Sequence, residues 1–339
     1  MEQPKRRPKT GIIVGWIALA LTGLAFAAWT AARAMGGPEM SVSPEWQPTA
    51  HDFAFAVAMR RDQPYAVGNF GITRGKPGTA APDSAKTPRT WEKVADTGAE
   101  SLLGIAFSPD GSGVAAGQLG LMLGAAAHSD NWRRIESGNQ RRLFAVAASD
   151  EGVFLVAGEL GTLLYRRQGG ARFETVKTKW AGFEAPNLYD ATFISSDTAI
   201  AVGESGAIVT VTDGLITTTL ETGPESLYAV VRCGEGLYSV GQEGRVEIKR
   251  GRGDWQASTV PGAPDLYGAA CIQSSTLAAV GAGSLYLTSG LGDTLSWHQI
   301  TLPSVQAPWF SGVVALAPQP ALLLTGPGGL WEARLSDAK

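Results

Sequence analysis

Two apolar segments flank a tight glycine turn in Ala201-Val202-Gly203-Glu204-Ser205-Gly206-Ala207-Ile208-Val209-Thr210. The same Gly-x-x-Gly unit recurs at intervals of about forty residues, a repeat length typical of propellers and solenoids. Further copies begin at Gly68, Gly117, Gly158 and Gly241, with looser versions at Gly281 and Gly326. A turn that needs positive φ accepts glycine at low steric cost, so these glycines indicate structure rather than chemistry.

Each repeat contains four strand-like segments. Two apolar segments precede the glycine turn, a third follows it, and a fourth often begins with tryptophan, as at Trp91, Trp132, Trp255 and Trp297. Four short antiparallel strands per repeat are typical of a propeller blade. No segment after residue 40 shows a helical period, which excludes a helical solenoid. We therefore predict an all-β, seven-bladed propeller over residues 44–339.

The two ends of this array complement each other. The last repeat has three strand-like segments before the chain ends at Lys339, whereas Glu45-Trp46-Gln47-Pro48-Thr49 looks like a fourth strand without the preceding three. We predict that this N-terminal segment completes the seventh blade. Closing the ring in this way removes the open sheet edges that invite aggregation.

The first forty residues differ from the rest. Four cations in residues 1–10 precede an uncharged run over residues 11–32, which as a helix would span about 33 Å and could cross a bilayer core of ~30 Å. The flanking cations predict a cytoplasmic N-terminus, a transmembrane signal anchor at 11–32 and a linker at 33–43. The alternative is a cleaved signal peptide, because Ala32-Arg33-Ala34 has the form of a cleavage site. Either way the propeller would lie outside the cytoplasm.

The repeat resembles that of the photosystem II stability and assembly factor propellers, which carry degenerate BNR or Asp-box repeats. The resemblance rests on the 201–210 stretch, on Thr212-Asp213-Gly214 after it, and on Ser129-Asp130-Asn131-Trp132. It implies a non-catalytic ring that holds or delivers subunits of an integral membrane protein complex from the periplasmic or luminal side. Anchored bacterial members of this kind tend to accompany exporters of the RND type, which implies a place in the bacterial inner membrane.

No motif in the sequence supports catalysis, a cofactor or a metal site. The three histidines, His51, His128 and His298, are far apart in the sequence, and neither a phosphate-binding loop nor a nucleophile elbow is present. A net charge of −3 disfavours nucleic acid as a partner. BNR repeats also occur in sialidases, but Tyr189, Tyr228 and Tyr267 recur at one repeat position, which indicates scaffold rather than a single nucleophile. The alternatives left open are a glycan- or ligand-binding propeller and, less favoured, a sialidase-like glycosidase.

The remaining candidates lie on the surface. We call the edge of the ring with the Gly-x-x-Gly turns and the inter-blade loops the first rim, and the opposite edge the second rim. The first rim is predicted to be acidic, with Glu100, Glu159 and Asp265 among its acids, whereas the second carries basic clusters on alternate blades, the first of them formed by Arg60, Arg61, Arg74 and Lys76. Such clusters could contact acidic partner loops or anionic lipid headgroups. The interface candidates on the second rim are Arg166, Arg167, Arg250 and Arg252.

Two insertions interrupt the repeat. A proline-containing loop separates Thr73 from Trp91 on the second rim, and an insertion over residues 177–187 carries Trp180 and Phe183 on the first rim. Exposed aromatic side chains in a loop can anchor a partner, although these two could equally pack against the neighbouring blade. Trp180 and Phe183 complete the set of predicted interface residues.

The only cysteines are Cys233 and Cys271, in the first strands of successive repeats. Aligned on the repeat, their positions differ by one residue, so their side chains should point to opposite faces of their sheets. From this we expect two separate buried thiols rather than a disulfide.

Overall fold

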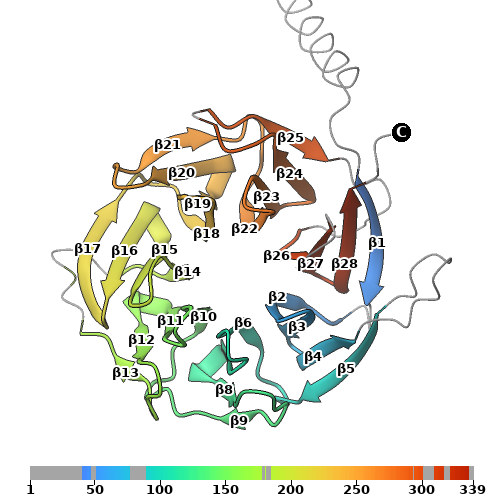
Figure 1. The fold of residues 1–339 in the computed structure, drawn as a ribbon, viewed down its shortest axis with the longest axis vertical. Helices are drawn as coiled ribbons and strands as arrows, with labels where there is room; N and C mark the ends of the chain where they lie inside the picture. Colours follow the sequence, from blue (N-terminus) through green and yellow to red (C-terminus); the bar gives the residue numbers. More distant parts are fainter. Residues whose placement is uncertain are drawn as a thin grey trace, which may run out of the picture. The chain divides into compact units, whose positions relative to one another are not determined.

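The computed structural model describes residues 40–46, 51–76, 89–177, 180, 185–292, 294–300, 309–316 and 321–335. Within these residues the chain forms seven four-stranded antiparallel sheets, which are arranged as blades around a central channel (Figure 1). The predicted seven-bladed propeller is confirmed. The predicted membrane span at 11–32 and the Pro-containing part of the loop after Thr73 lie outside the described residues. In the part of the chain that is described, no helix is long and apolar enough to cross a membrane.

The blades follow one another along the chain, with the first strand of each nearest the channel (Figure 1). Blade 1 consists of β2 (Ala54–Arg60), β3 (Gln63–Gly68), β4 (Gly71–Lys76) and β5 (Thr90–Ala95). Blade 2 consists of β6 (Leu102–Phe107), β7 (Gly113–Gly117), β8 (Met122–Ala125) and β9 (Arg133–Arg134). Blade 3 consists of β10 (Leu143–Ala148), β11 (Phe154–Gly158), β12 (Leu163–Arg166) and β13 (Glu174–Thr175). Blade 4 consists of β14 (Leu188–Phe193), β15 (Thr198–Gly203), β16 (Ala207–Thr212) and β17 (Leu215–Glu221). Blade 5 consists of β18 (Leu227–Cys233), β19 (Gly236–Gly241), β20 (Arg245–Arg250) and β21 (Gln256–Thr259). Blade 6 consists of β22 (Leu266–Ile272), β23 (Thr276–Gly281), β24 (Ser284–Thr288) and β25 (Trp297–Ile300). Blade 7 consists of β26 (Gly312–Leu316), β27 (Ala321–Gly326), β28 (Gly329–Leu335) and β1 (Met40–Trp46).

The repeated turns fold as short 3-10 elements: η1 (Gln118–Gly120), η2 (Glu159–Gly161), η3 (Glu204–Gly206) and η4 (Gln242–Gly244). Their two glycines are required for different reasons. Gly120 has a φ of +71°, a conformation that glycine adopts without steric cost. Gly117 is extended, but a Cβ there would collide with the carbonyl oxygen of Ser101. The first glycine of the turn therefore allows the inner strand to approach closely, whereas the second allows a positive φ. The sequence pattern predicts only the second of these two reasons.

Side chains from neighbouring blades form the core. The cluster between blades 5 and 6 is representative, because it joins Tyr238 and Val246 of blade 5 to Leu277 and Ala279 of blade 6. Second strands such as β11 and β19 are buried along their whole length. Each blade thus buries both of its faces, and the ring holds together through its seams.

The N-terminal strand closes the ring. β1 pairs antiparallel with β28, from Met40 opposite Leu335 to Trp46 opposite Leu330. The predicted closure by the segment around Trp46 is confirmed, although the strand begins at Met40, within the expected linker 33–43, and Gln47 to Thr49 lie outside the described residues. Arg89 of blade 1 reinforces this seam, because its Nη1 lies 3.0 Å from Glu45 and 2.6 Å from Glu332.

The expectation of two free thiols is wrong. Cys233 at the end of β18 and Cys271 in β22 form a disulfide, with Cα atoms 5.2 Å apart. The two side chains do point to opposite faces of their own blades, as the register predicted. Neighbouring blades stack so that one face of the first meets the opposite face of the next, and both cysteines lie in the cluster between blades 5 and 6. Opposite faces are therefore what a bridge between blades requires.

Candidate functional site

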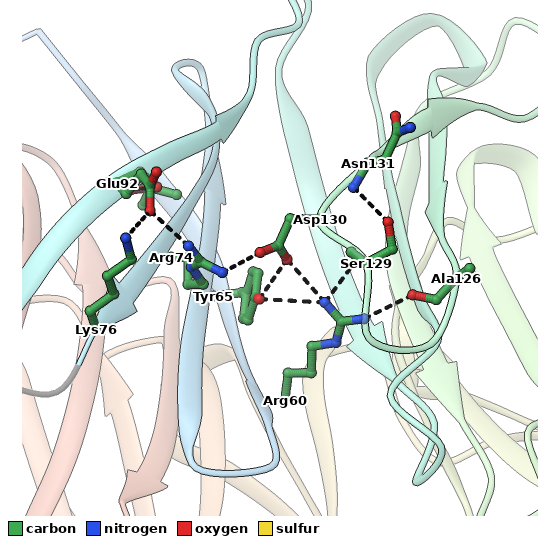
Figure 2. A network of polar contacts seen from close by, with 10 residues as sticks. Arg60, Tyr65, Arg74, Lys76, Glu92, Ala126, Ser129, Asp130 and Asn131 are labelled. Carbon is green, nitrogen blue, oxygen red and sulfur yellow. Dashed lines mark hydrogen bonds and ion pairs between the residues drawn. The ribbon is translucent and has the colours of Figure 1, made fainter.

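The second rim contains a polar network that links blades 1 and 2 (Figure 2). Asp130, from the Asp-box segment between β8 and β9, accepts hydrogen bonds from Tyr65 Oη at 2.7 Å and from Arg60 Nη1 at 3.0 Å, and it pairs with Arg74. Arg60 also donates to the carbonyl of Ala126 at 2.8 Å. The acid of this Asp box therefore holds two arginines of the preceding blade.

Glu92 engages the rest of this predicted basic cluster. Its Oε2 lies 2.7 Å from Arg74 Nη2 and 2.6 Å from Lys76 Nζ. The side-chain hydrogen bonds from Lys76 and Arg74 lower the pKa of the Glu92 carboxyl. The cations of blade 1 are thus largely neutralised by acids of the same and the next blade.

The four predicted interface arginines do not form one patch with a common role. Arg166 is half-buried, with its guanidinium 4.6 Å from the ring centre of Phe154 and 5.1 Å from that of Phe173. Arg167 is exposed and pairs with Asp213 of blade 4 at 3.1 Å. Arg250 Nη2 donates to the carbonyl of Gly292 at 2.6 Å, and Arg252 is exposed. Three of the four are therefore engaged within the ring.

Of the two predicted aromatic anchors, only Trp180 lies within the described residues; Phe183 does not. Trp180 is half-buried and packs against the core cluster between blades 3 and 4. Its indole lies over Gly161, where a Cβ would collide with it. Trp180 therefore packs against the ring instead of extending from the loop as an exposed anchor for a partner.

The first rim has a different character. β6 pairs with β7 so that Leu102 lies opposite Gly117, which places the start of each inner strand at the rim of the glycine turns. The second residue of the inner strand faces the channel there. A cavity of about 400 Å³ opens at this mouth and is lined by Phe55, Leu103, Phe144, Tyr189, Tyr228, Tyr267, Trp309 and Ser311. The channel mouth is therefore mainly aromatic.

Four of these rings form a continuous arc. The ring centres of Phe144, Tyr189, Tyr228 and Tyr267 lie 5.4 to 5.5 Å apart from one to the next, with interplanar angles of 51° to 58°. Burial raises the pKa of each of the three tyrosines, and carboxylates raise it further, Glu204 beside Tyr189 and Asp265 beside the other two. The hydroxyls accordingly stay protonated near neutral pH. The recurrence of tyrosine at one repeat position was the sequence signal for this arc, and we had interpreted it as scaffold.

Asp190 breaks the symmetry of the channel, a feature that the sequence analysis missed. At its position the other six blades carry Ala56, Gly104, Ala145, Ala229, Gly268 and Gly312. Asp190 lines the channel next to the tyrosine arc. Its Oδ1 accepts the N–H of Ala191 and its Oδ2 accepts the N–H of Val230 from blade 5, both at 2.8 Å. Burial raises the pKa of the Asp190 carboxyl to about 7, and the two N–H donors act in the opposite direction.

Two leucines extend the apolar character of the first rim. Leu119 in η1 is 66% exposed and Leu160 in η2 is 56% exposed. Both have left-handed backbone conformations, with φ of +53° and +51°, which are unfavourable for leucine. The same left-handed position holds Ser205 in blade 4 and Glu243 in blade 5, so the backbone conformation belongs to the repeated turn, whereas the exposed leucine side chains are particular to blades 2 and 3.

The acids predicted for the first rim have mixed roles. Glu159 pairs with Arg142 at 3.5 Å, and Glu100 pairs with Arg134. Asp265 accepts the N–H of Glu243 at 2.9 Å and the hydroxyl of Tyr267 at 3.4 Å. Among the described residues, no group of three histidine, cysteine or acidic side chains could hold a metal ion.

Comparison with known proteins identifies the fold. No protein-family model and no curated protein matches the sequence. Among solved structures, the chain is similar to the WD40 β-propeller domain of Doa1, with a TM-score of 0.68 and 13% identity over 88% of this chain and 98% of that one. At this identity the similarity shows the propeller fold alone.

Proposed function

We propose that this protein is a non-catalytic, membrane-anchored propeller that serves as an assembly, stability or accessory factor for an integral membrane protein complex. The observation that carries the proposal is the apolar first rim, which has an aromatic cavity of about 400 Å³ at the channel mouth and the exposed Leu119 and Leu160 in the turns of blades 2 and 3. Large apolar groups exposed on one face of a folded protein mark interaction sites. A propeller with such a face suits a protein-binding role.

The location proposed is the periplasmic or luminal side of a bacterial inner membrane, with a cytoplasmic N-terminus. The Cys233–Cys271 disulfide supports it, because disulfides persist in oxidising compartments and are rare in the cytosol. The cations and the apolar run at 11–32 support the anchor. The resemblance to photosystem II assembly factors, and through it to partners of RND exporters, gives the class of partner.

The contents of the channel mouth support a binding role over a glycosidase role. A sialidase-like mechanism needs an arginine cluster for the substrate carboxylate, a tyrosine nucleophile and an acidic partner. The described lining of the mouth and channel supplies tyrosines and one acid, Asp190, but no arginine. We therefore propose that the ring binds without catalysis.

The test is affinity purification of the tagged full chain from mild detergent extracts, followed by mass spectrometry. Leu119→Ser with Leu160→Ser should reduce recovery of a membrane protein about tenfold, as expected when two central apolar contacts are lost. Leu215→Ser is the matched control, because Leu215 is 60% exposed but lies on the outer strand β17.

Three results would contradict this proposal. They are the absence of any co-purifying membrane protein, equal recovery with the first-rim double variant, and retention of the chain on carbohydrate arrays, which would support glycan binding. Charge reversal of Arg166, Arg167, Arg250 and Arg252 tests the second rim in parallel, and a loss of recovery confined to that variant would place the contact there.

A further inference from the structure

The channel mouth combines two features that are useful for binding one chemical group. It is lined mainly by aromatic rings, and the adjoining part of the channel, which Tyr189, Tyr228 and Tyr267 also line, contains a single acid among its described residues, Asp190. The described lining contains no cationic side chain that could neutralise this acid. Asp190 is also the one residue that departs from the Ala or Gly found at its position in the other blades. Repeat symmetry therefore does not explain its presence.

We propose that the channel mouth receives a lysine or arginine side chain from a loop of a partner protein, held against Tyr189, Tyr228 and Tyr267 and paired with Asp190. This inference deepens the proposed function by naming the chemistry of the contact on the first rim. Aromatic rings attract cations within about 6 Å of their centres, and this attraction strengthens when water is excluded. A partly enclosed mouth of about 400 Å³ lies in the size range of sites that hold small ligands.

The two hydrogen bonds that Asp190 accepts do not use all the acceptor positions of its carboxylate. A carboxylate offers about four acceptor positions, and Asp190 uses two of them for the N–H groups of Ala191 and Val230. The remaining positions can accept the N–H donors of an ammonium or a guanidinium. The tether to Val230 also fixes the carboxylate between blades 4 and 5, whose tyrosines are in direct ring contact at 5.5 Å.

Charge around the mouth favours a cation over an anion. Asp265 accepts a hydrogen bond from Tyr267, and Glu204 raises the pKa of Tyr189, so both acids contribute negative potential at the arc. The titratable side chains that line the channel in the described residues are Tyr189, Asp190, Tyr228 and Tyr267. Because the tyrosine pKa values are raised, Asp190 is the group among them that changes charge between pH 5 and 8. Cation binding should therefore strengthen as the pH rises through this range.

The experiment uses the full chain in detergent and blocked glycine pentapeptides with a central lysine, arginine, norleucine or glutamate, followed by ligand-observed NMR titration. Lysine and arginine peptides should bind about tenfold more tightly than the norleucine peptide at pH 8, and the glutamate peptide should bind most weakly. The lysine affinity should fall about tenfold between pH 8 and pH 5.5 as Asp190 becomes protonated.

Asp190→Ala should abolish both the cation preference and the pH dependence. The ring should tolerate this change, because Ala56, Ala145 and Ala229 occupy the same position in other blades. Tyr228→Leu provides a second variant and should weaken lysine binding several-fold without removing its pH dependence. Asp150→Asn is the matched control, since Asp150 is an exposed acid on the second rim, and it should leave binding unchanged.

Equal binding of the norleucine and lysine peptides would overturn the proposal and make the mouth an apolar pocket only. Unchanged lysine binding by Asp190→Ala would overturn it as well. These outcomes are distinct from failure of the proposed function, because a chain that recovers no membrane protein could still bind lysine peptides with the expected pH profile. Conversely, a membrane partner recovered equally by wild type and Asp190→Ala would support the function and reject this contact.

Discussion

The two rims of the propeller use their side chains for different purposes. On the second rim, Asp130, the Arg167–Asp213 pair and the Cys233–Cys271 bridge each join one blade to the next. On the first rim, Leu119, Leu160 and the tyrosine arc are exposed or line an open cavity. The difference indicates that clusters of charge in a repeat protein can serve the ring itself, whereas recognition is expected where apolar groups remain accessible.

Loss of the disulfide should have the largest effect on stability. The two cysteines are separated by 38 residues, for which the chain-entropy relation gives about 4 kcal/mol. We expect Cys233→Ala with Cys271→Ala to lower the free energy of unfolding by about this amount in urea titrations. Wild type treated with a reductant should shift equally. An unchanged midpoint after complete alkylation of both thiols would show that the second rim does not depend on this bridge.

Removal of Asp130 should come next. Asp130→Ala leaves the guanidinium groups of Arg60 and Arg74 and the hydroxyl of Tyr65 without their shared acceptor, so the free energy of unfolding should fall by about 3 kcal/mol. Asp150→Ala, which removes an exposed acid from the same rim, should stay within about 0.5 kcal/mol of wild type. Recovery of the partner should be unaffected by Asp130→Ala. A parallel loss of the partner would contradict the assignment of partner binding to the first rim alone.

Asp190 should make the free energy of unfolding decrease as the pH rises, which is the opposite of the effect of an acid with a lowered pKa. Its folded pKa of about 7 lies above the ordinary value of 3.8, so the folded state binds the proton more tightly. Stability from this group is greatest below pH 4, declines between pH 4 and pH 7, and is constant above that. The expected decline is on the order of 2 kcal/mol, since channel water relaxes part of the burial cost.

The difference in unfolding free energy between wild type and Asp190→Ala, measured from pH 4 to 8, isolates this contribution. Acids with lowered pKa values, such as Asp110 and Asp197, stabilise the folded protein less as the pH falls. Their contribution to the unfolding free energy is the same in both proteins and cancels in the difference. A difference that does not vary with pH would mean that Asp190 is charged throughout.

The smallest effect is expected at the exposed leucines, and it has the opposite sign. Asn tolerates a φ near +53° better than leucine, so Leu119→Asn should raise the free energy of unfolding by about 0.5 to 1 kcal/mol. The same change should reduce recovery of the partner. Leu215→Asn on β17, where the backbone is that of a strand, should not stabilise the protein. A destabilising Leu119→Asn would show that this leucine supports the fold.

Much of the fold could be predicted from the repeat, because its glycines are required by the local backbone conformation of the turn. Gly120 requires positive φ and Gly117 requires close approach to Ser101, and both needs recur in each blade with a regular turn. The closure by the segment around Trp46 followed from counting strands. Its start at Met40 could not be predicted, because β1 is specified by pairing with β28 rather than by its own pattern.

The site was harder to predict, because it depends on which blades face each other. The register of Cys233 and Cys271 was correctly derived, but their pairing depends on the stacking of blades. Arg60 and Arg74 looked like a basic patch because Asp130 is more than fifty residues away in the sequence. Asp190 was visible as a single departure from Ala or Gly, yet its position in the channel emerges only when all seven inner strands are in place.

The pairing of Met40 with Leu335 also governs the order in which the protein can be made. β1 is synthesised before the strands of blades 1 to 6 and β28 after them, so the seventh sheet stays incomplete until all six blades have been synthesised. Pairings this distant in sequence form slowly and leave open strand edges in the meantime. Blades 1 to 6 can assemble in sequence during synthesis, and the synthesis of β26 to β28 then completes the ring.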